Sequence, residues 1–199
     1  MTRLTGIRES IAYYFTQPVV RLLAKTPITP NAITWFGLLV AVGAAVLIST
    51  SHLFAAGFVV LVGGFFDIID GALARNTNRT SRFGAVLDST LDRLAEAAVL
   101  IGILALYARE QSVIGVLVVG FAWLGSLLVS YIRARAEALG LECQVGLFTR
   151  AERVVVLALG LLLNQVVDNA LIIALAIIVV FSFITVGQRL FYVWRQTKN

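Results

Sequence analysis

Four aspartates in an otherwise apolar stretch are the residues of this chain best suited to chemistry. Asp67 and Asp70 are three residues apart, and Asp88 and Asp92 are four apart, so each pair lies on one face of a helix. The residues between the pairs predict a short polar turn: Gly71, Arg75, Arg79, Arg82 and Gly84. Two helices joined there would run antiparallel and bring the four carboxylates together.

Four converging carboxylates predict a metal site. They cannot all stay ionised around one small volume unless cations join them. Oxygen ligands in that number suit magnesium, manganese or calcium rather than zinc, and a two-metal site suits displacement at phosphorus. In the alternative interpretation the aspartates cap helices and pair with the nearby arginines; their number and spacing favour the metal site.

The same stretch resembles the signature of the CDP-alcohol phosphotransferases. The motif reads Asp-x-x-Asp-Gly-x-x-Ala-Arg, eight residues, then Gly-x-x-x-Asp-x-x-x-Asp, and every fixed position is filled between Asp67 and Asp92. The resemblance implies that an alcohol attacks a CDP-linked lipid and releases CMP. It also implies two Mg²⁺ or Mn²⁺ ions, one held by Asp67, Asp70 and Asp88 and the other by Asp67, Asp88 and Asp92, with Asp92 as the base.

The resemblance further implies a binding site for the cytidine diphosphate of the lipid. Its residues would be Asn31, Thr34, Gly71, Ala74, Arg75, Ser81 and Gly84. Arg75 supplies a fixed cation for a diphosphate, and Gly71 lets a ligand approach the backbone. For Asn31 a helix N-cap is the alternative interpretation.

Three further arginines resemble the acceptor site of the phosphatidylinositol phosphate synthases and archaetidylinositol phosphate synthases. In those relatives, basic residues from three helices bind the phosphate of inositol phosphate; by local motif they would be Arg133, Arg153 and Arg189. Arginine holds phosphate through paired hydrogen bonds. In the alternative interpretation of these residues, the arginines only anchor helix ends at the membrane surface. The alternative acceptors are glycerol 3-phosphate, as in the phosphatidylglycerophosphate synthases, or serine, or a plain alcohol.

Composition predicts a polytopic all-α membrane protein. Of 199 residues, 59% are hydrophobic, and the mean hydropathy is +0.92. The single Cys143 excludes an internal disulfide, and the distribution of the +5 net charge argues against a nucleic-acid partner. A cation transporter is the non-enzyme alternative, since intramembrane aspartates also line ion paths.

The apolar pattern predicts one domain over residues 1–199. An amphipathic interfacial helix is expected over residues 3–24, followed by a six-helix bundle over residues 31–194. The expected spans are 31–48, 53–75, 84–107, 112–138, 150–166 and 169–194. The basic residues, Arg109 excepted, gather on one side of these spans, which predicts a cell-membrane protein with both termini and the active site in the cytoplasm. Relatives suggest a homodimer.

Overall fold

The computed structural model describes residues 17–77 and 80–198. Within these ranges the chain is helical, with no strand, which confirms the all-α prediction. Of the predicted interfacial helix, residues 17–23 are helical, and the part up to residue 16 lies outside the described residues. Arg79 of the predicted polar turn also lies outside them. The long helices are α2 (Pro30–Ser49), α3 (Leu53–Asn76), α4 (Arg82–Arg109), α5 (Val113–Ala138), α6 (Arg150–Leu163) and α7 (Ala170–Thr197).

The observed helix ends follow the predicted ones closely, with two instructive differences. The helix expected at 150–166 ends at Leu163, because the Asn164 side chain accepts a hydrogen bond from the Leu171 amide (3.1 Å) and turns the chain into α7. At the start of α2, Thr29 is the N-cap and accepts from the Ala32 amide at 3.3 Å. The capping role considered for Asn31 is therefore wrong, and its side chain is available for another task.

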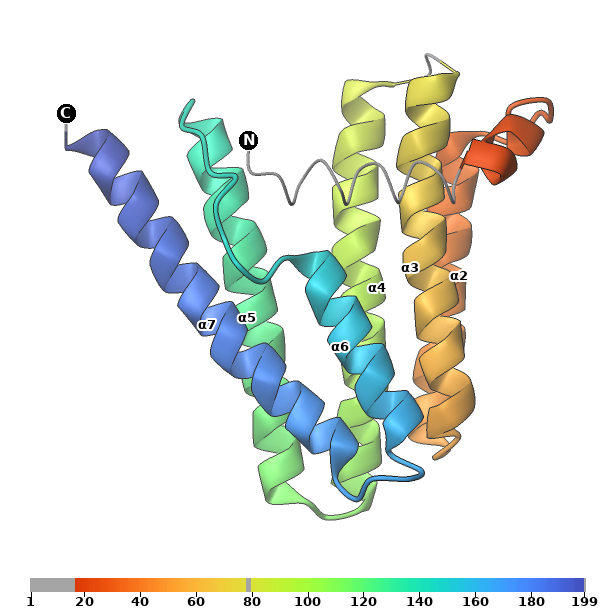
Figure 1. Cartoon of the computed structure of the whole chain (residues 1–199), viewed down its shortest axis with the longest axis vertical. Helices are drawn as coiled ribbons and strands as arrows, with labels where there is room; N and C mark the ends of the chain where they lie inside the picture. The colour runs from red at the N-terminus through yellow and green to blue at the C-terminus, as the bar shows by residue number, and fades with distance from the viewer. Residues whose placement is uncertain (1–16, 78–79, 199) are drawn as a thin grey trace.

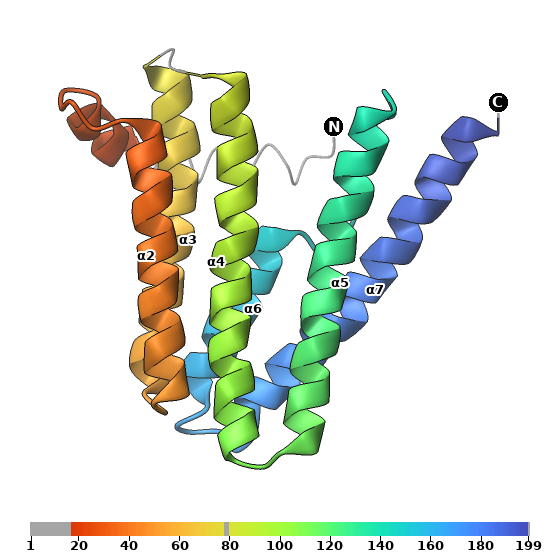
Figure 2. The ribbon, with the colours of Figure 1, turned by 180° about the vertical axis from the view of Figure 1, so that it is seen from behind.

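The helices alternate in direction and form two groups that diverge toward one end (Figures 1 and 2). α2 packs against α3 and α4, α5 packs against α7, and α6 lies against both α3 and α7. The turns around residues 50–52, 110–112 and 164–169 share one end, and the α3–α4 turn lies at the other. Helix α6 is shorter than its neighbours and begins partway along the bundle rather than at the end where α4 starts (Figure 1).

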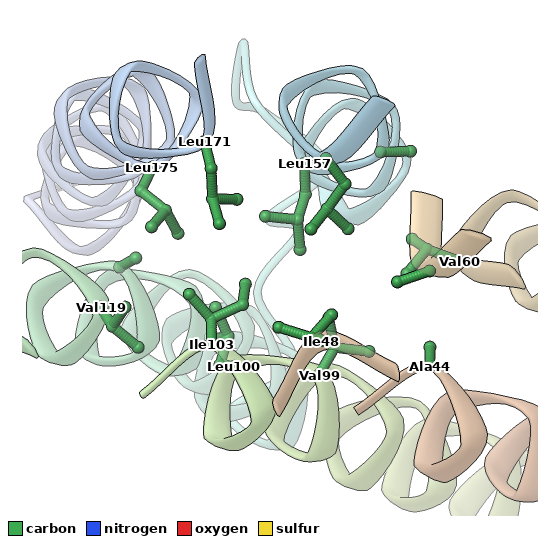
Figure 3. Packing of buried hydrophobic residues seen from close by; sticks show 14 of the residues in the cluster. Ala44, Ile48, Val60, Val99, Leu100, Ile103, Val119, Leu157, Leu171 and Leu175 are labelled. Atoms are coloured by element: carbon green, nitrogen blue, oxygen red, sulfur yellow. The ribbon is translucent and has the colours of Figure 1, made fainter. Parts of the chain in front are cut away.

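An apolar core joins the two groups of helices toward the end of the bundle where α2 ends and α7 begins. Ile48, Ile103, Leu157 and Leu171, from α2, α4, α6 and α7, meet there (Figure 3). Between membrane helices such side chains stabilise the contact through close van der Waals packing. The core fixes the depth at which the first turn of α6 meets α3 and α4.

In the described part of the chain, four helices are long and apolar enough to cross a membrane: α2, α3, α5 and α7. Helix α6 has 14 residues, which reach about 21 Å at 1.5 Å per residue, less than the roughly 30 Å hydrocarbon core. Helix α4 carries Asp88, Asp92 and Glu96 among its apolar residues. The structure thus agrees with a multi-pass membrane protein.

Candidate active site

The carboxylates of Asp67, Asp88 and Asp92 converge between α3 and α4. One oxygen of each lies within 4.8 Å of the others. Asp67 is nine residues before the end of α3, and Asp92 is ten residues after the start of α4, so both lie about 13–15 Å along their helices from the α3–α4 turn. The predicted convergence on antiparallel helices holds for three of the four carboxylates, and Asp70 is not part of this group.

Asp70 lies beside this cluster and is more deeply buried. Only 4% of the residue is exposed. Its Oδ1 accepts a hydrogen bond from the Gly71 amide at 2.6 Å, whereas its Oδ2 is buried without a partner among the described residues. A buried carboxylate oxygen with no donor is costly, which indicates that a ligand belongs there.

Arg150 contacts the cluster from the first turn of α6. Its Nη1 lies 2.5 Å from Asp67 Oδ1 and 2.7 Å from Asp92 Oδ1. Helix α6 begins at that depth because Thr149 and Glu152 form a capping box, in which the Glu152 carboxylate accepts from the Thr149 amide at 2.8 Å. Sequence reasoning missed this role of Arg150, although Arg150 and Arg153 are spaced to lie on one face of α6.

The donor set fits divalent cations. It contains only carboxylate oxygens, from Asp67, Asp88 and Asp92 with Asp70 alongside, and these are the ligands that Mg²⁺ and Mn²⁺ prefer. Among the described residues, Arg150 is the one arginine that forms ion pairs with the cluster, and it pairs with Asp67 and Asp92 only, so three carboxylates face one paired cation.

A hollow of about 550 Å³ lies over the start of α2 and the α3–α4 turn; we call it the hairpin hollow. Its lining includes all seven residues predicted to bind the CDP-lipid, namely Asn31, Thr34, Gly71, Ala74, Arg75, Ser81 and Gly84, together with Asp70 and Asp88. A methyl group added at Gly84 would approach the Asn31 Oδ1 to 3.5 Å, so these two positions face each other closely. Ser81 also caps α4, because its Oγ accepts from the Gly84 amide at 2.9 Å.

A second cleft of about 800 Å³, the α6 cleft, adjoins the carboxylates of Asp67 and Asp92. Apolar residues of α2, α3 and α4 form most of its wall. Its polar lining is Thr34, Asp67, Asp70, Asp92, Glu96, Ser126, Arg150 and Arg153. The two spaces share Thr34 and Asp70; Asp67 and Asp92 line only the α6 cleft, and Asp88 lines only the hairpin hollow, so carboxylates of the cluster border both spaces.

The three arginines predicted for the acceptor have different surroundings. Arg153 lines the α6 cleft and is 3% exposed. Arg189 is 4% exposed and donates to two backbone carbonyls, Val145 O at 2.9 Å and Val129 O. Arg133 is exposed and pairs with Glu137 at 2.8 Å. Arg133 and Arg153 are close enough to Arg189 for their charges to act on it, and burial of Arg153 and Arg189 excludes a role as surface anchors for those two.

Glu96 is a polar residue that sequence reasoning did not select. It forms a bidentate ion pair with Arg153, with distances of 2.7 Å to Nε and 3.1 Å to Nη2. A signal was present, because Asp88, Asp92 and Glu96 follow one another every four residues along one face of α4.

Comparison with known proteins agrees with this geometry. Residues 27–192 match the CDP-alcohol phosphatidyltransferase family. The archaetidylinositol phosphate synthase of Methanothermobacter thermautotrophicus is 37% identical, over 98% of this chain and 100% of its own length. Two crystal structures of the Mycobacterium tuberculosis phosphatidylinositol phosphate synthase are 36% identical: one with CDP-DAG bound (TM-score 0.79; 90% of this chain, 93% of that one) and one with manganese and citrate (0.80; 90% and 88%). The chain therefore belongs to the CDP-alcohol phosphatidyltransferase family.

Proposed function

We propose that this protein transfers the phosphatidyl-type group of a CDP-linked lipid, CDP-diacylglycerol or its ether-lipid analogue, to inositol phosphate and releases CMP. The observation that carries the proposal is the placement of the carboxylates between two spaces that share Thr34 and Asp70. A transferase of this type must hold a donor and an acceptor on either side of one phosphorus atom. The relatives at 36–37% identity are synthases of phosphatidylinositol phosphate and archaetidylinositol phosphate.

The hairpin hollow is the donor side of the proposal. Asn31, Thr34 and Ser81 offer hydrogen bonds to a nucleotide, and Arg75 offers a cation to its diphosphate. A ligand in this hollow lies next to Asp70 and Asp88, which also line it. The M. tuberculosis relative has been crystallised with CDP-DAG, which supports a nucleotide-lipid donor.

Asp67, Asp70, Asp88 and Asp92 would hold the divalent ions, for which magnesium or manganese is expected. Bound there, the ions would neutralise the phosphate oxygens and stabilise the leaving CMP. Asp92 also lines the α6 cleft, where it can take the proton of the acceptor hydroxyl. The acceptor oxygen then forms a bond to the lipid-bearing β-phosphorus, the bond from that phosphorus to the CMP oxygen breaks, and CMP carries away the electron pair.

The acceptor phosphate is assigned to Arg153, with Arg189 and Arg133 nearby. Arg153 Nη1 is buried without a hydrogen-bond partner among the described residues, and the residue lines the cleft beside Asp92. A phosphate supplies the acceptor atoms that such a guanidinium lacks. Glycerol 3-phosphate presents the same group and is the competing acceptor.

The proposal also covers the protein's setting. One domain of six spans, preceded by an interfacial helix, would lie in the cell membrane with both termini and the acidic cluster on the cytoplasmic side, as a homodimer. The grouping of arginines and lysines supports this orientation. Four described helices are long and apolar enough for a span. Helices α4 and α6 would complete the six, with the loop at 139–149 covering the depth that the 14 residues of α6 do not reach.

An acceptor panel tests the proposal. Purified protein receives one CDP-lipid and magnesium with inositol phosphate, free inositol, glycerol 3-phosphate or serine, and CMP is measured. Inositol phosphate should be preferred over free inositol by a large factor. Equal use of free inositol, or a clear preference for glycerol 3-phosphate, would overturn the acceptor assignment and leave family membership intact.

A further inference from the structure

We propose that Glu96 is a positioning residue for the acceptor: it holds the Arg153 guanidinium in the orientation that binds the acceptor phosphate. The inference rests on the function proposed above and adds to it a specificity determinant on α4. It is carried by the ion pair between α4 and α6 and by the buried Nη1 atom of Arg153, a residue of the α6 cleft lining, that this pair leaves unpaired among the described residues.

The Glu96 carboxylate binds one edge of the planar Arg153 guanidinium. The guanidinium carries five N–H groups in one plane. Glu96 accepts from Nε at 2.7 Å and from Nη2 at 3.1 Å. The plane of the guanidinium is thereby fixed, and Nη1 is left buried without a partner in the described part of the chain.

The pair is a poor choice for stability alone. Arg153 is 3% exposed and the Glu96 side chain 15%, and Ala95, Val99, Leu157 and Val154 line the same cleft. Replacing such a buried ion pair with apolar residues is often neutral or stabilising. A buried polar pair with an unused donor at a cleft wall is instead expected where a ligand completes the hydrogen bonds.

The rest of this polar group agrees with a ligand site. Ser126 on α5 lies beside Glu96 and lines the same cleft. Arg150, one turn before Arg153, is already engaged by Asp67 and Asp92. Without Glu96, the Arg153 side chain would be free to turn toward those same carboxylates, and the phosphate would lose its oriented donor.

The test is a kinetic comparison of Glu96→Gln with Arg153→Gln and with the double variant. Glu96→Gln should raise the KM for inositol phosphate about tenfold to hundredfold, the size of a lost charge-assisted hydrogen bond. The KM for CDP-lipid should stay within about twofold, and the preference for inositol phosphate over free inositol should fall. In the double variant, the loss should not exceed that of Arg153→Gln, because the two residues act as one unit.

Glu110→Gln is the matched control. It makes the same substitution on the same helix, but Glu110 is exposed and caps the end of α4 opposite the acidic cluster, so the KM should stay within about twofold. If Glu96→Gln does not fold, as judged by size-exclusion chromatography and thermal unfolding, Glu96→Asp is tested in its place. Its shorter side chain keeps the negative charge but moves the carboxylate away from the Arg153 guanidinium. A raised acceptor KM in a folded Glu96→Asp protein supports the proposal.

The outcomes separate this inference from the proposed function. If the wild type prefers glycerol 3-phosphate, the function is wrong, and the same KM comparison with glycerol 3-phosphate still tests Glu96. If the wild type uses no phosphorylated acceptor, both fail. An unchanged or lower acceptor KM in Glu96→Gln, or a loss that adds to that of Arg153→Gln, overturns the role of Glu96 while the function stands.

Discussion

Asp92→Asn is predicted to abolish turnover without destabilising the metal-free protein. The substitution keeps the shape of the side chain and removes one charge from the acidic cluster. With an effective dielectric constant of about 20, loss of the contact with Arg150 at 2.7 Å removes about 6 kcal/mol of attraction. The same change removes repulsion of at least about 3.5 kcal/mol from each of Asp67 and Asp88, whose oxygens lie within 4.8 Å.

The repulsion removed, at least about 7 kcal/mol for the two pairs together, is no smaller than the attraction lost, and this comparison depends little on the dielectric constant because all three pairs share one environment. The side chains are 21–31% exposed at Asp92, Arg150 and Asp67, so solvent screening reduces attraction and repulsion together. The desolvation cost of one carboxylate is also removed. The free energy of unfolding in chelator should therefore be unchanged or higher in the variant, and its Tm should be no lower than that of the wild type.

The assay combines CMP release with thermal unfolding in detergent. Loss of a catalytic base costs about 10²–10⁴-fold in rate, and loss of a metal ligand adds to that. Added magnesium should stabilise the wild type more than the variant, because the variant has one ligand fewer. More than half of the wild-type rate in Asp92→Asn would remove Asp92 from the mechanism, and a Tm in chelator lower by about 10 °C would mean that the loss of activity is structural.

Three further predictions follow from the geometry. Chelation should stop CMP release and added magnesium or manganese should restore it; full activity with metal content confirmed as nil would refute the carboxylate metal site. Arg75→Gln, in the hairpin hollow, should raise the KM for CDP-lipid at least about tenfold with little effect on the acceptor KM, and the reverse pattern would exchange donor and acceptor sides. Gly102→Ala should destabilise the fold by about 1–3 kcal/mol, because its methyl group would lie 2.6 Å from the Ala45 carbonyl oxygen. In the control Gly43→Ala, the methyl group meets nothing within 4 Å, so this change should be neutral or slightly stabilising. Equal Tm shifts in the two variants would contradict the close α2–α4 packing.

The sequence was sufficient for the parts of the site that lie on one helical hairpin. Spacing of three and four residues places Asp67, Asp88 and Asp92 on facing sides of two antiparallel helices, and the structure has them there. The seven residues expected around the nucleotide line one hollow for the same reason: most of them lie on that hairpin or at the nearby start of α2.

The contacts made by α6 could not be predicted from residue spacing. The depth at which Arg150 meets the cluster depends on how the loop at 139–149 descends and where the capping box starts the helix, and no periodicity encodes that. Pairing of Glu96 with Arg153 joins positions 57 residues apart, so its detection from one sequence would need the packing of α4 on α6. The early end of α6 likewise depends on the hydrogen bond that the Asn164 side chain accepts from the Leu171 amide of α7.

The most direct test of the central claim is the identity of the lipid product. Purified protein is incubated with CDP-diacylglycerol, inositol phosphate and magnesium, and CMP and lipids are quantified by mass spectrometry. The account predicts equimolar CMP and phosphatidylinositol phosphate, and neither product in excess chelator. CMP without a new phosphoinositide, or the same yield with all divalent metal removed, would contradict a transfer reaction at the acidic cluster between the hairpin hollow and the α6 cleft.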